Sequence, residues 1–592
     1  MMGDIFKSKK NIVAAFFGCW AIQLAIGITV RNPLTVVFFV LILWAGAYRD
    51  SMGKELSKAD VAFRSLISVV ISGLITFLTF RKVTASFSSG IFKALSVGIL
   101  FLGFFLTGLL LSGALSAIRI PVLDRGGAGL GTSDLKTEQA GINQSTSYIK
   151  QILVVMGICL LCWLPYFLYE FPGIMTADSL VQYDEIYGTE PWSNHHPVIH
   201  TLMIGLFTKI GFLFTDNKNV SVAFYTVFQM IFMAYCCGVC ICHIKGKKAK
   251  ILATCFFALV TFNGVFVVTV WKDIIFAAVT MLLVCKILDL RDNERNSKTP
   301  DWILLGFYAF LFALFRANAW YALILWTPFF IYSFRKDIKK AISCLAVVLV
   351  MVIIAKGPLI TAFGVAQPGF VESLSVPTQQ IARVLVEGAE IPSKDTEMIS
   401  AVMDTSYVKE LYCPEIGDNI KELIKAGHPE VIENNKGAYL GLWARIIIRH
   451  PVIATRAWFD MLGGYIYPDV PYNVGDTDGI MGNSLGLSWT PLIGGKLVVK
   501  GKEILIKLGS FVPLYGMLWS IGAYTWLLAI ALFVAIRNKG EVLSKILLLM
   551  LIASLMLAAP LVDFRYGYAV VMTMPVWVMS IFDKRNSNER AD

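Results

Sequence analysis

A polar segment that directly follows an apolar stretch contains side chains suited to acid–base chemistry. The segment Glu170–Thr201 holds five carboxylates and three of the six histidines of the chain. Carboxylate and imidazole groups can take up and release protons in a reaction. Charged groups at the edge of a lipid-facing region are costly unless they serve a function. The segment is therefore the first candidate for a reactive loop.

Further charged residues follow three of the apolar stretches. They lie in the motifs Trp271-Lys272-Asp273, Arg316-Ala317-Asn318 and Asp563-Phe564-Arg565-Tyr566. A large polar segment adds Gln379, Gln380 and Arg383. Arginine and lysine bind phosphate oxygens through charge-assisted hydrogen bonds, and a carboxylate can take the proton of a hydroxyl group. Together these residue types indicate a site for a phosphorylated lipid substrate.

Each of these residues also has a simpler explanation. Asp273 could pair with its neighbour Lys272, and Asp563 could pair with Arg565 across two helices. Asp178 could cap a helix that begins at Ser179, because aspartate is common at that position.

Two acidic or histidine-rich patterns indicate metal sites only weakly. His195 and His196 could bind a metal with Asp184, and His200 lies one helical turn after His196. In 469–479, Asp476 and Asp478 are spaced like part of a calcium loop, but the bidentate acid of such a loop is missing.

Composition indicates a membrane protein built from helices. Of the 592 residues, 56% are hydrophobic and 16% are charged. Several nearly uncharged runs are long enough to cross ~30 Å of hydrocarbon. The net charge of +11 comes from lysines and arginines in short loops, as the positive-inside rule predicts. There is no basic stripe with interleaved aromatics, so nucleic-acid binding is excluded. The chain lacks a G-x-x-x-x-G-K-[ST] motif, which argues against an ATP-driven pump.

The basic loops also predict the topology. If 198–214 lies along the outer interface as a juxtamembrane helix, five later basic loops fall on the cytoplasmic side, and the count is about fourteen spans. The expected spans are 11–30, 33–48, 62–80, 91–117, 150–168, 219–242, 250–268, 274–290, 302–316, 319–334, 340–356, 511–536, 542–560 and 566–582.

This topology divides the chain into five parts. They are an N-terminal four-span module (1–117), a cytoplasmic linker (118–149), a transmembrane module with the external loop 170–201 (150–356), an extracytoplasmic domain (357–510), and C-terminal spans with a cytoplasmic tail (511–592). Within the extracytoplasmic domain we expect helices near 372–387, 418–426 and 438–463, and loops over 464–500.

Several motifs resemble those of the GT-C superfamily of glycosyltransferases, which use polyprenyl-phosphate-sugar donors. An early aspartate in an external loop (Asp178) precedes a His-Pro pair in HHPVIH (195–200), as in members similar to protein O-mannosyltransferases. The motifs FPG-x-x-x-x-D, HHP, WKD, FRANAW and DFRY most resemble poorly characterised bacterial membrane proteins of that superfamily. The resemblance covers 150–356 and 511–582.

The resemblance implies an all-α GT-C-like bundle with a mixed extracytoplasmic domain, in which 150–356 is the catalytic module. It implies Asp178 as the general base, a phosphate site, and inversion at the sugar carbon. Taken with the charged motifs above, we expect three groups of site residues. Asp178, Asp273 and His196 are expected to be catalytic, and Lys272, Arg316 and Arg565 are expected to bind the donor phosphate. The residues expected to bind substrate are Gln182, Tyr183, His195, Asn318, Gln379, Gln380, Arg383 and Tyr566. This chain differs in having a single proline in HHP and four additional N-terminal spans. Without a D-x-D or E-x-D triplet around Asp178, a divalent metal (Mg²⁺ or Mn²⁺) stays open and no other cofactor is assigned.

The expected function is transfer of a sugar from a polyprenyl-phosphate donor to a glycan or lipid of the cell envelope. The expected location is a bacterial plasma membrane, with multiple spans and both termini in the cytoplasm; the sequence gives no oligomeric state. One alternative is a flippase or transporter of lipid-linked sugars. Another is a noncatalytic scaffold, or an oligosaccharide polymerase or ligase with the same lipid substrate. A transporter would have charges near the membrane midplane and broken helices in repeated halves.

Overall fold

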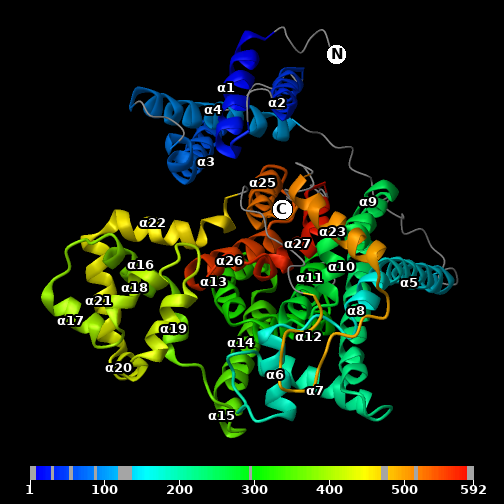
Figure 1. Cartoon of the computed structure of the whole chain (residues 1–592). Coiled ribbons are helices and arrows are strands. Elements are labelled where there is room, and N and C mark those ends of the chain that lie inside the picture. Colours follow the sequence, from blue (N-terminus) through cyan, green and yellow to red (C-terminus); the bar gives the residue numbers. More distant parts are fainter. Residues whose placement is uncertain are drawn as a thin grey trace. The chain divides into compact units, whose positions relative to one another are not determined.

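The computed structural model describes residues 8–28, 33–51, 58–85, 90–117, 137–292, 297–467, 478–511 and 518–582. Over these ranges the chain is helical, and extended pairing is limited to isolated bridges. The chain divides into two compact units, Met1–Val122 with Arg537–Lys539, and Leu123–Ile536 with Gly540–Asp592. Figure 1 shows the helices of both units.

The first unit contains the four helices expected near the N-terminus. They are α1 (Lys9–Ile26), α2 (Pro33–Ser51), α3 (Lys58–Ala85) and α4 (Gly90–Ala117). On α3, Ser68, Ser72 and Thr76 are buried and follow one another at four-residue intervals. A Cβ atom on Gly108 of α4 would lie 3.0 Å from Ser68 Oγ. Small side chains thus bring α3 and α4 close together, as in many membrane helix pairs.

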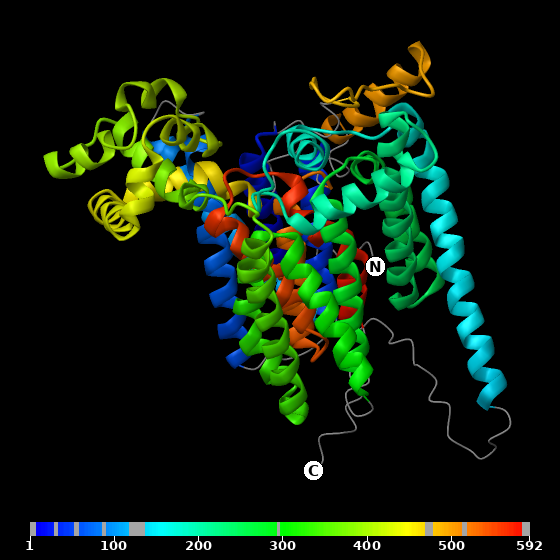
Figure 2. The ribbon, with the colours of Figure 1, turned by 90° about the horizontal axis from the view of Figure 1, so that it is seen from below.

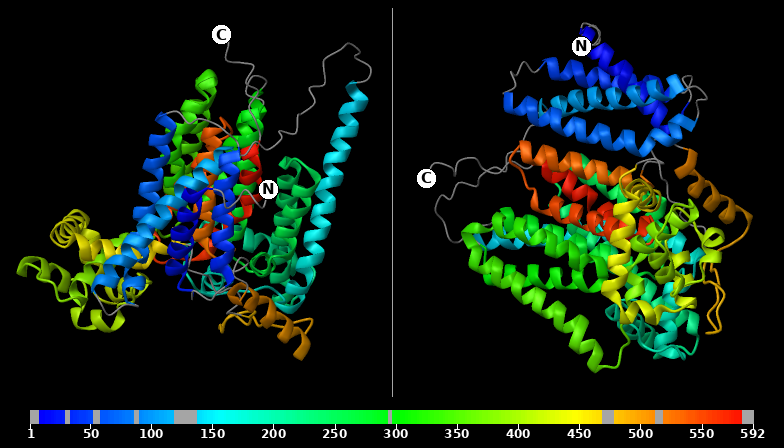
Figure 3. Two further views of the ribbon diagram at one scale, coloured as in Figure 1. Left: turned by 90° about the horizontal axis from the view of Figure 1, so that it is seen from above. Right: turned by 90° about the vertical axis from the view of Figure 1, so that its left-hand side faces the viewer.

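The second unit is built around α11 (Lys272–Asp292). Nearly every residue from Asp273 to Cys285 is buried, which fits a helix that is apolar on all sides. Its neighbours are α8 (Lys218–His243), α12 (Thr299–Phe315), α26 (Leu543–Ala558) and α27 (Phe564–Met579). Helices α12, α13 (Ala317–Ser333) and α14 (Ile338–Ile354) run side by side (Figures 2 and 3). The unit also contains α5 (Thr137–Tyr169), α6 (Ala177–Tyr187), α7 (Val198–Phe212) and α25 (Ile521–Arg537).

Five helices are long and apolar enough to cross a membrane: Lys58–Ala85, Ser96–Gly113, Tyr148–Tyr169, Lys218–His243 and Arg335–Ala362. A sixth is added if α9 (Lys247–Leu259) and α10 (Thr261–Val267), which meet at a bend of 56°, count as one span. Helices α7, α12, α25 and α26 are apolar but shorter. Over the ranges that the structure describes, the chain is therefore all-helical with five helices that could span a membrane, fewer than the expected fourteen.

Three boundaries differ from those expected. Helix α5 begins at Thr137, so the end of the expected linker is helical. A helix can continue into water where its side chains are polar. Residues 118–136 of the expected linker lie outside the described residues. The expected span 250–268 is broken at Val260. Backbone carbonyls freed near the break accept hydrogen bonds from side chains. Asn263 Nδ2 donates to Phe256 O at 2.9 Å, and Trp163 Nε1 donates to Phe257 O at 3.2 Å. The expected span 511–536 is replaced by α25, preceded by a separate helix, α23 (Lys496–Phe511).

The expected mixed domain at 357–510 is helical in its described residues, so the mixed assignment is wrong. Its helices are α16 (Ser375–Val386), α17 (Ser393–Ser400), α18 (Val408–Leu411), α19 (Asp418–Ala426), α20 (Pro429–Asn434), α21 (Lys436–Arg449) and α22 (Pro451–Leu462). They share an apolar core that includes Ala382, Val384 and Ile420. We call α16–α22 the lateral domain. It lies at one end of α12–α14, as does α23 (Figures 2 and 3).

Candidate functional site

The loop before α6 is held between two other loops. Ile174 N donates to Val268 O at 2.9 Å, and Met175 N donates to Gly479 O at 3.0 Å. At Gly173 the backbone φ is +141°, and a Cβ atom would lie 2.5 Å from Thr226 Oγ1, so this close approach requires glycine. The loop thereby fixes the start of α6, where Thr176 N donates to Ser179 Oγ at 2.9 Å. Asp178 lies in the first turn of α6 rather than at its N-cap, which is Thr176.

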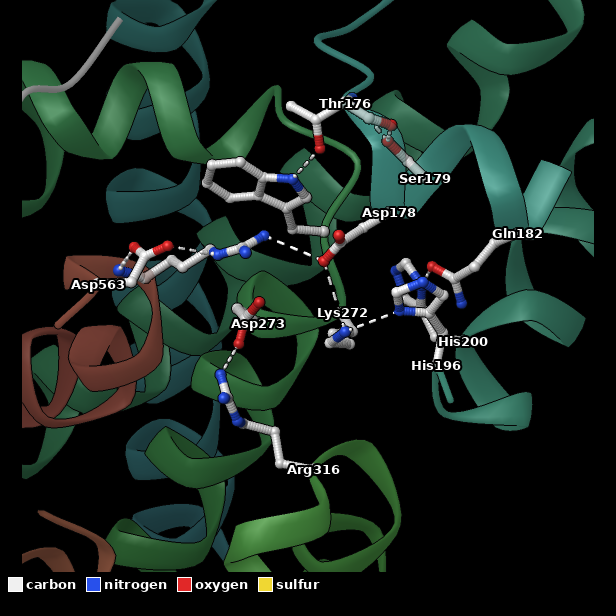
Figure 4. A network of polar contacts seen from close by, with 12 residues as sticks. Thr176, Asp178, Ser179, Gln182, His196, His200, Lys272, Asp273, Arg316 and Asp563 are labelled. Atoms are coloured by element: carbon white, nitrogen blue, oxygen red, sulfur yellow. Dashed lines mark hydrogen bonds and ion pairs between the residues drawn. The ribbon is translucent and has the colours of Figure 1, made fainter. Parts of the chain in front are cut away.

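Asp178 is bound by two cations from distant parts of the chain. Its Oδ2 accepts from Arg565 Nη1 at 3.1 Å and lies 3.5 Å from Lys272 Nζ. Figure 4 shows Asp178 and Lys272 facing each other at the centre of the polar network. The guanidinium of Arg565 also lies over the ring of Trp271, at 4.8 Å from its centroid. Trp271 in turn donates from Nε1 to Thr176 Oγ1 at 2.8 Å, which ties this stack to α6.

Lys272 also sets the hydrogen-bonding state of His196. Lys272 Nζ lies 2.9 Å from His196 Nδ1. A protonated lysine can only donate, so Nδ1 is the acceptor and the proton of the neutral imidazole is on Nε2. His196 is buried just before α7 and presents an Nε2–H donor to a ligand.

The pKa values at this point of the site follow from burial and the two cations. Burial alone would raise the pKa of Asp178, but Lys272 and Arg565 outweigh it and hold that pKa well below its usual range. Burial lowers the pKa of Lys272 to about 8. Burial, together with the nearby Lys272, lowers the pKa of His196 to about 3. At neutral pH the site therefore contains an ionised Asp178, a largely protonated Lys272 and a neutral His196.

A second ion pair lies beside the first. Asp273 is fully buried and pairs with Arg316 rather than with its neighbour Lys272. Arg316 lies in the extended link between α12 and α13, and its Nε donates to Asn318 Oδ1 at 3.0 Å. Its guanidinium lies over the ring of Tyr566, 4.4 Å from the centroid. Asp273 Oδ2 is buried without a hydrogen-bond partner within the described residues.

The DFRY motif forms the third part of the site. Asp563 caps α27, its Oδ1 accepting from Arg565 N at 2.9 Å. Its Oδ2 accepts from Arg565 Nε at 2.7 Å, so the two residues pair within one turn and not across two helices. The ring of Tyr566 lies between two arginines, with Arg565 at 5.1 Å and Arg316 at 4.4 Å from its centroid. This contact links the two ion-paired regions.

A buried hydrogen-bond chain holds α6, α7 and α8 together below Asp178. Tyr225 OH lies 2.7 Å from His200 Nε2, and His200 Nδ1 lies 2.8 Å from Gln182 Oε1. Because the amide oxygen of Gln182 only accepts, His200 carries its proton on Nδ1 and accepts at Nε2 from the Tyr225 hydroxyl, whose oxygen also lies 3.2 Å from Gln229 Oε1. Gln182 Nε2 then donates to Thr201 Oγ1 at 2.9 Å, and Thr201 Oγ1 donates to Glu185 Oε2 at 3.0 Å. His200 is therefore a structural residue.

Lys356 is a cation of this region that sequence reasoning missed. It lies in a π-helical turn, Ala355–Leu359, and its Nζ donates to Arg316 O at 3.5 Å. Its own carbonyl accepts from Gln367 Nε2 at 3.1 Å, and Gln367 Oε1 accepts from Asn194 Nδ2 at 3.1 Å, two residues before His196. A lone lysine within the apolar run before Gly357, at the end of a span, was the available signal.

The structure brings together most of the expected site residues. Those joined through the contacts above are Asp178, His196, Lys272, Asp273, Arg316, Asn318, Arg565 and Tyr566. His195 is exposed beside His196, with the two rings 4.8 Å apart. Gln182 belongs to the buried chain, and Tyr183 packs in an apolar cluster with Leu180 and Ile204.

Three expected residues lie within the lateral domain instead. Gln379 Nε2 donates to Cys413 O at 2.6 Å, and Gln380 Nε2 donates to Ala454 O at 3.0 Å. Arg383 pairs with Glu387 and Asp460. These contacts are internal to the domain and make none of the three a partner of Asp178.

The carboxylates do not fit a divalent metal. Asp178, Asp273 and Asp563 each have a cationic partner. Asp184, expected beside the histidine pair, accepts from Thr189 N at 3.0 Å. In the calcium-like loop, Asp478 pairs with Lys502, and Asp476 lies outside the described residues. Among the residues that the structure describes, no group of three or more His, Cys, Asp or Glu side chains could hold a metal ion. The donor set suits an anionic ligand instead.

Comparison with known proteins identifies the family. Residues 188–592 match the family of unknown function DUF6020, and the chain belongs to this family. The match includes Lys272, Asp273, Arg316 and Arg565 and begins after Asp178. No curated protein and no solved structure matches the chain.

Proposed function

We propose that this member of the DUF6020 family is a membrane glycosyltransferase of GT-C type. It moves a sugar from a polyprenyl-phosphate donor to a glycan or lipid of the cell envelope. The observation that carries the proposal is a carboxylate, Asp178, bound by Lys272 and Arg565 beside a neutral His196. A base, two phosphate-binding cations and a hydrogen-bond donor are thereby within reach of one ligand.

In this reaction the bond between the sugar carbon and the phosphate oxygen breaks, and the acceptor oxygen forms a new bond to that carbon. The electron pair leaves with the polyprenyl phosphate, whose oxygens are bound by Lys272 and Arg565. The proton of the acceptor hydroxyl goes to Asp178, and inversion at the sugar carbon follows from a single displacement. His196 donates from Nε2 to the sugar or to the phosphate.

Donor binding would also activate the base. In the unliganded site the two cations hold the pKa of Asp178 low, which makes it a weak base. A phosphate group that hydrogen bonds to Lys272 and Arg565 neutralises their charge and removes the cause of that low pKa. Asp178 would thus become a stronger base only once the donor is bound, which limits wasteful reaction without donor.

The finer features of the fold belong to the same proposal. About fourteen helices, including the shorter apolar ones, would cross a bacterial plasma membrane with both termini in the cytoplasm. The site and the lateral domain would then face the outer side, where the domain contacts the acceptor.

The proposed function can be tested by adding radiolabelled undecaprenyl-phosphate-sugar donors to the purified protein in nanodiscs. We expect hydrolysis or transfer by the wild type, and a loss of about 10²–10⁴-fold in Asp178→Asn. Asp184→Asn, on the same helix, is the matched control and should stay active, because an amide oxygen can still accept from Thr189 N. Equal turnover in Asp178→Asn and wild type would assign the base to another residue, with Asp273 next.

The break between α9 and α10 favours one alternative, a flippase for the same lipid. Discontinuous helices are typical of transporters, and these two meet at 56°. Two results together would favour the flippase. The protein would bind the donors but turn none of them over, and it would move the labelled lipid between the leaflets of proteoliposomes.

A further inference from the structure

Helix α23 exposes an apolar stripe that no other part of the described chain covers. Leu497 is 89% exposed, Ile504 52% and Leu505 39%. Their spacing of seven and eight residues places them on one side of the helix. Lys496 and Lys500 are exposed at the edge of this stripe. A helix with an apolar stripe bordered by lysines is typical of segments that lie in a membrane interface.

The other side of α23 is fixed to the protein by a buried ion pair. Lys502 Nζ lies 3.1 Å from Glu170 Oε1, and Glu170 is 2% exposed. The same Nζ pairs with Asp478 and lies 5.1 Å from the centroid of the Tyr169 ring. Lys502 is five residues from Leu497, more than a third of a turn around the helix. The ion pair therefore holds Leu497 away from the protein, whereas Leu505, three residues after Lys502, lies nearer to it.

The segment before α23 is tied to the end of a candidate span. Leu492 N donates to Leu168 O at 2.8 Å, and Trp489 Nε1 donates to Tyr169 O at 2.8 Å. These acceptors are in the last turn of α5, whose residues Leu161 and Leu164 are 72% and 42% exposed. The stripe on α23 thus begins where the exposed apolar surface of a span ends.

We propose that α23 lies in the membrane interface and binds anionic lipids. Leu497, Ile504 and Leu505 enter the acyl-chain region, and Lys496 and Lys500 bind the headgroups. The partner is a lipid surface because the stripe continues the exposed surface of α5, and it is anionic because the border of the stripe is basic. The proposal requires that α5 crosses the membrane but does not depend on glycosyl transfer.

An environment-sensitive fluorescent amino acid at Leu497 of the full-length protein would test this. The matched control carries the same label at Glu503, an exposed residue on the Lys496 flank of α23, about 120° around the helix from Leu497. Both proteins are placed in nanodiscs of phosphatidylcholine, with or without phosphatidylglycerol, that contain spin-labelled lipid. We expect quenching at position 497 to exceed that at 503 by about twofold or more, and to increase with phosphatidylglycerol.

Two further variants separate the parts of the proposal. Lys496→Glu combined with Lys500→Glu should remove the increase with phosphatidylglycerol, and a label at Ile504 should behave like that at Leu497. Equal quenching at 497 and 503 would overturn the membrane contact, and equal quenching in both lipid mixtures would overturn the preference for anionic lipid. Emission at 497 that shifts with protein concentration, without quenching by lipid, would show that a second copy covers the stripe, which also overturns the proposal.

Discussion

Arg565 donates from Nη1 to Asp178 Oδ2 at 3.1 Å across 387 positions of sequence. The same guanidinium donates from Nε to Asp563 Oδ2 and lies over Trp271. One side chain thus joins the C-terminal helices to the loop that carries the proposed base.

Replacing Arg565 should weaken donor binding more than it disturbs the fold. Arg565→Ala removes the cation that binds Asp178 and the proposed phosphate, and we expect kcat/KM for the donor to fall about 10- to 100-fold. Arg565→Lys should recover only part of this, because lysine lacks the planar fork. Arg449→Ala, which removes an exposed cation in the lateral domain, is the control. Steady-state kinetics that are unchanged in Arg565→Ala would contradict the phosphate role.

Donor binding should weaken as pH rises through the pKa of Lys272. That pKa is lowered to about 8, so the ammonium is mostly present at pH 7 and mostly lost by pH 9. We expect donor affinity to fall about tenfold over this interval. Lys272→Arg should flatten the dependence, because arginine stays protonated. The measurement is a donor-binding isotherm at each pH, and a flat isotherm in the wild type would show that the charge of Lys272 is not used.

The effect of Lys272 on stability has the opposite direction with pH. Its folded-state pKa is lowered from the ordinary lysine value of 10.5 to about 8, so the unfolded chain binds more protons between these values. The contribution of this residue to the free energy of unfolding therefore rises with pH over the interval in which donor affinity falls. Because the contribution of Lys272 to stability rises with pH, unfolding caused by this residue cannot account for the expected loss of donor binding.

Lys356→Met should lower donor affinity while the fold is retained. Methionine fills similar space and removes a charge that, among the described residues, contacts only the carbonyl of Arg316. We expect the donor Kd to rise about tenfold. The matched control is Lys339→Met, an exposed lysine near the other end of the same span. An unchanged Kd in Lys356→Met would leave Lys272 and Arg565 as the phosphate-binding cations.

Tyr225→Phe should destabilise the protein without touching the ligand. It leaves His200 Nε2 buried without a donor, which costs about 1–3 kcal/mol of unfolding free energy. The measurement is thermal unfolding followed by tryptophan fluorescence, with Tyr332→Phe, at a 70% exposed position, as the control. Because the hydrogen-bond chain positions α6, kcat should fall while the donor KM changes little. Equal unfolding temperatures in the two variants would mean that the chain contributes nothing to stability.

The sequence predicts the positions of the apolar helices well, because a long run of apolar residues indicates a helix whatever its neighbours are. It predicts poorly which charged side chains form ion pairs with each other. Lys272 and Asp273 are adjacent, yet one meets Asp178 and the other meets Arg316, because successive residues at a helix start point in different directions. Which charge lies opposite which depends on tertiary packing.

The lateral domain shows the same limit. Gln379, Gln380 and Arg383 are polar residues on α16 and were assigned to substrate, but their partners are backbone carbonyls and acids of the same domain. A buried polar residue that satisfies its own domain cannot be distinguished by type from one that meets a ligand. Helix α23 was missed because its lysines and glycines resemble a loop, although its apolar residues have helical spacing.

The lateral domain and the segment that leads into it contact the two loops that carry the site. On one side, just before its first helix, Ala366 N donates to Trp192 O at 2.9 Å, four residues before His196. On the other, Gly417 N donates to Pro560 O at 2.7 Å, five residues before Arg565. An exchange of this domain between relatives, made to change the acceptor, would therefore succeed only if both junctions were transplanted with it. The two backbone junctions, together with the hydrogen bond from Trp458 Nε1 of α22 to Met556 O of α26 at 2.8 Å, constrain where any replacement domain can begin and end.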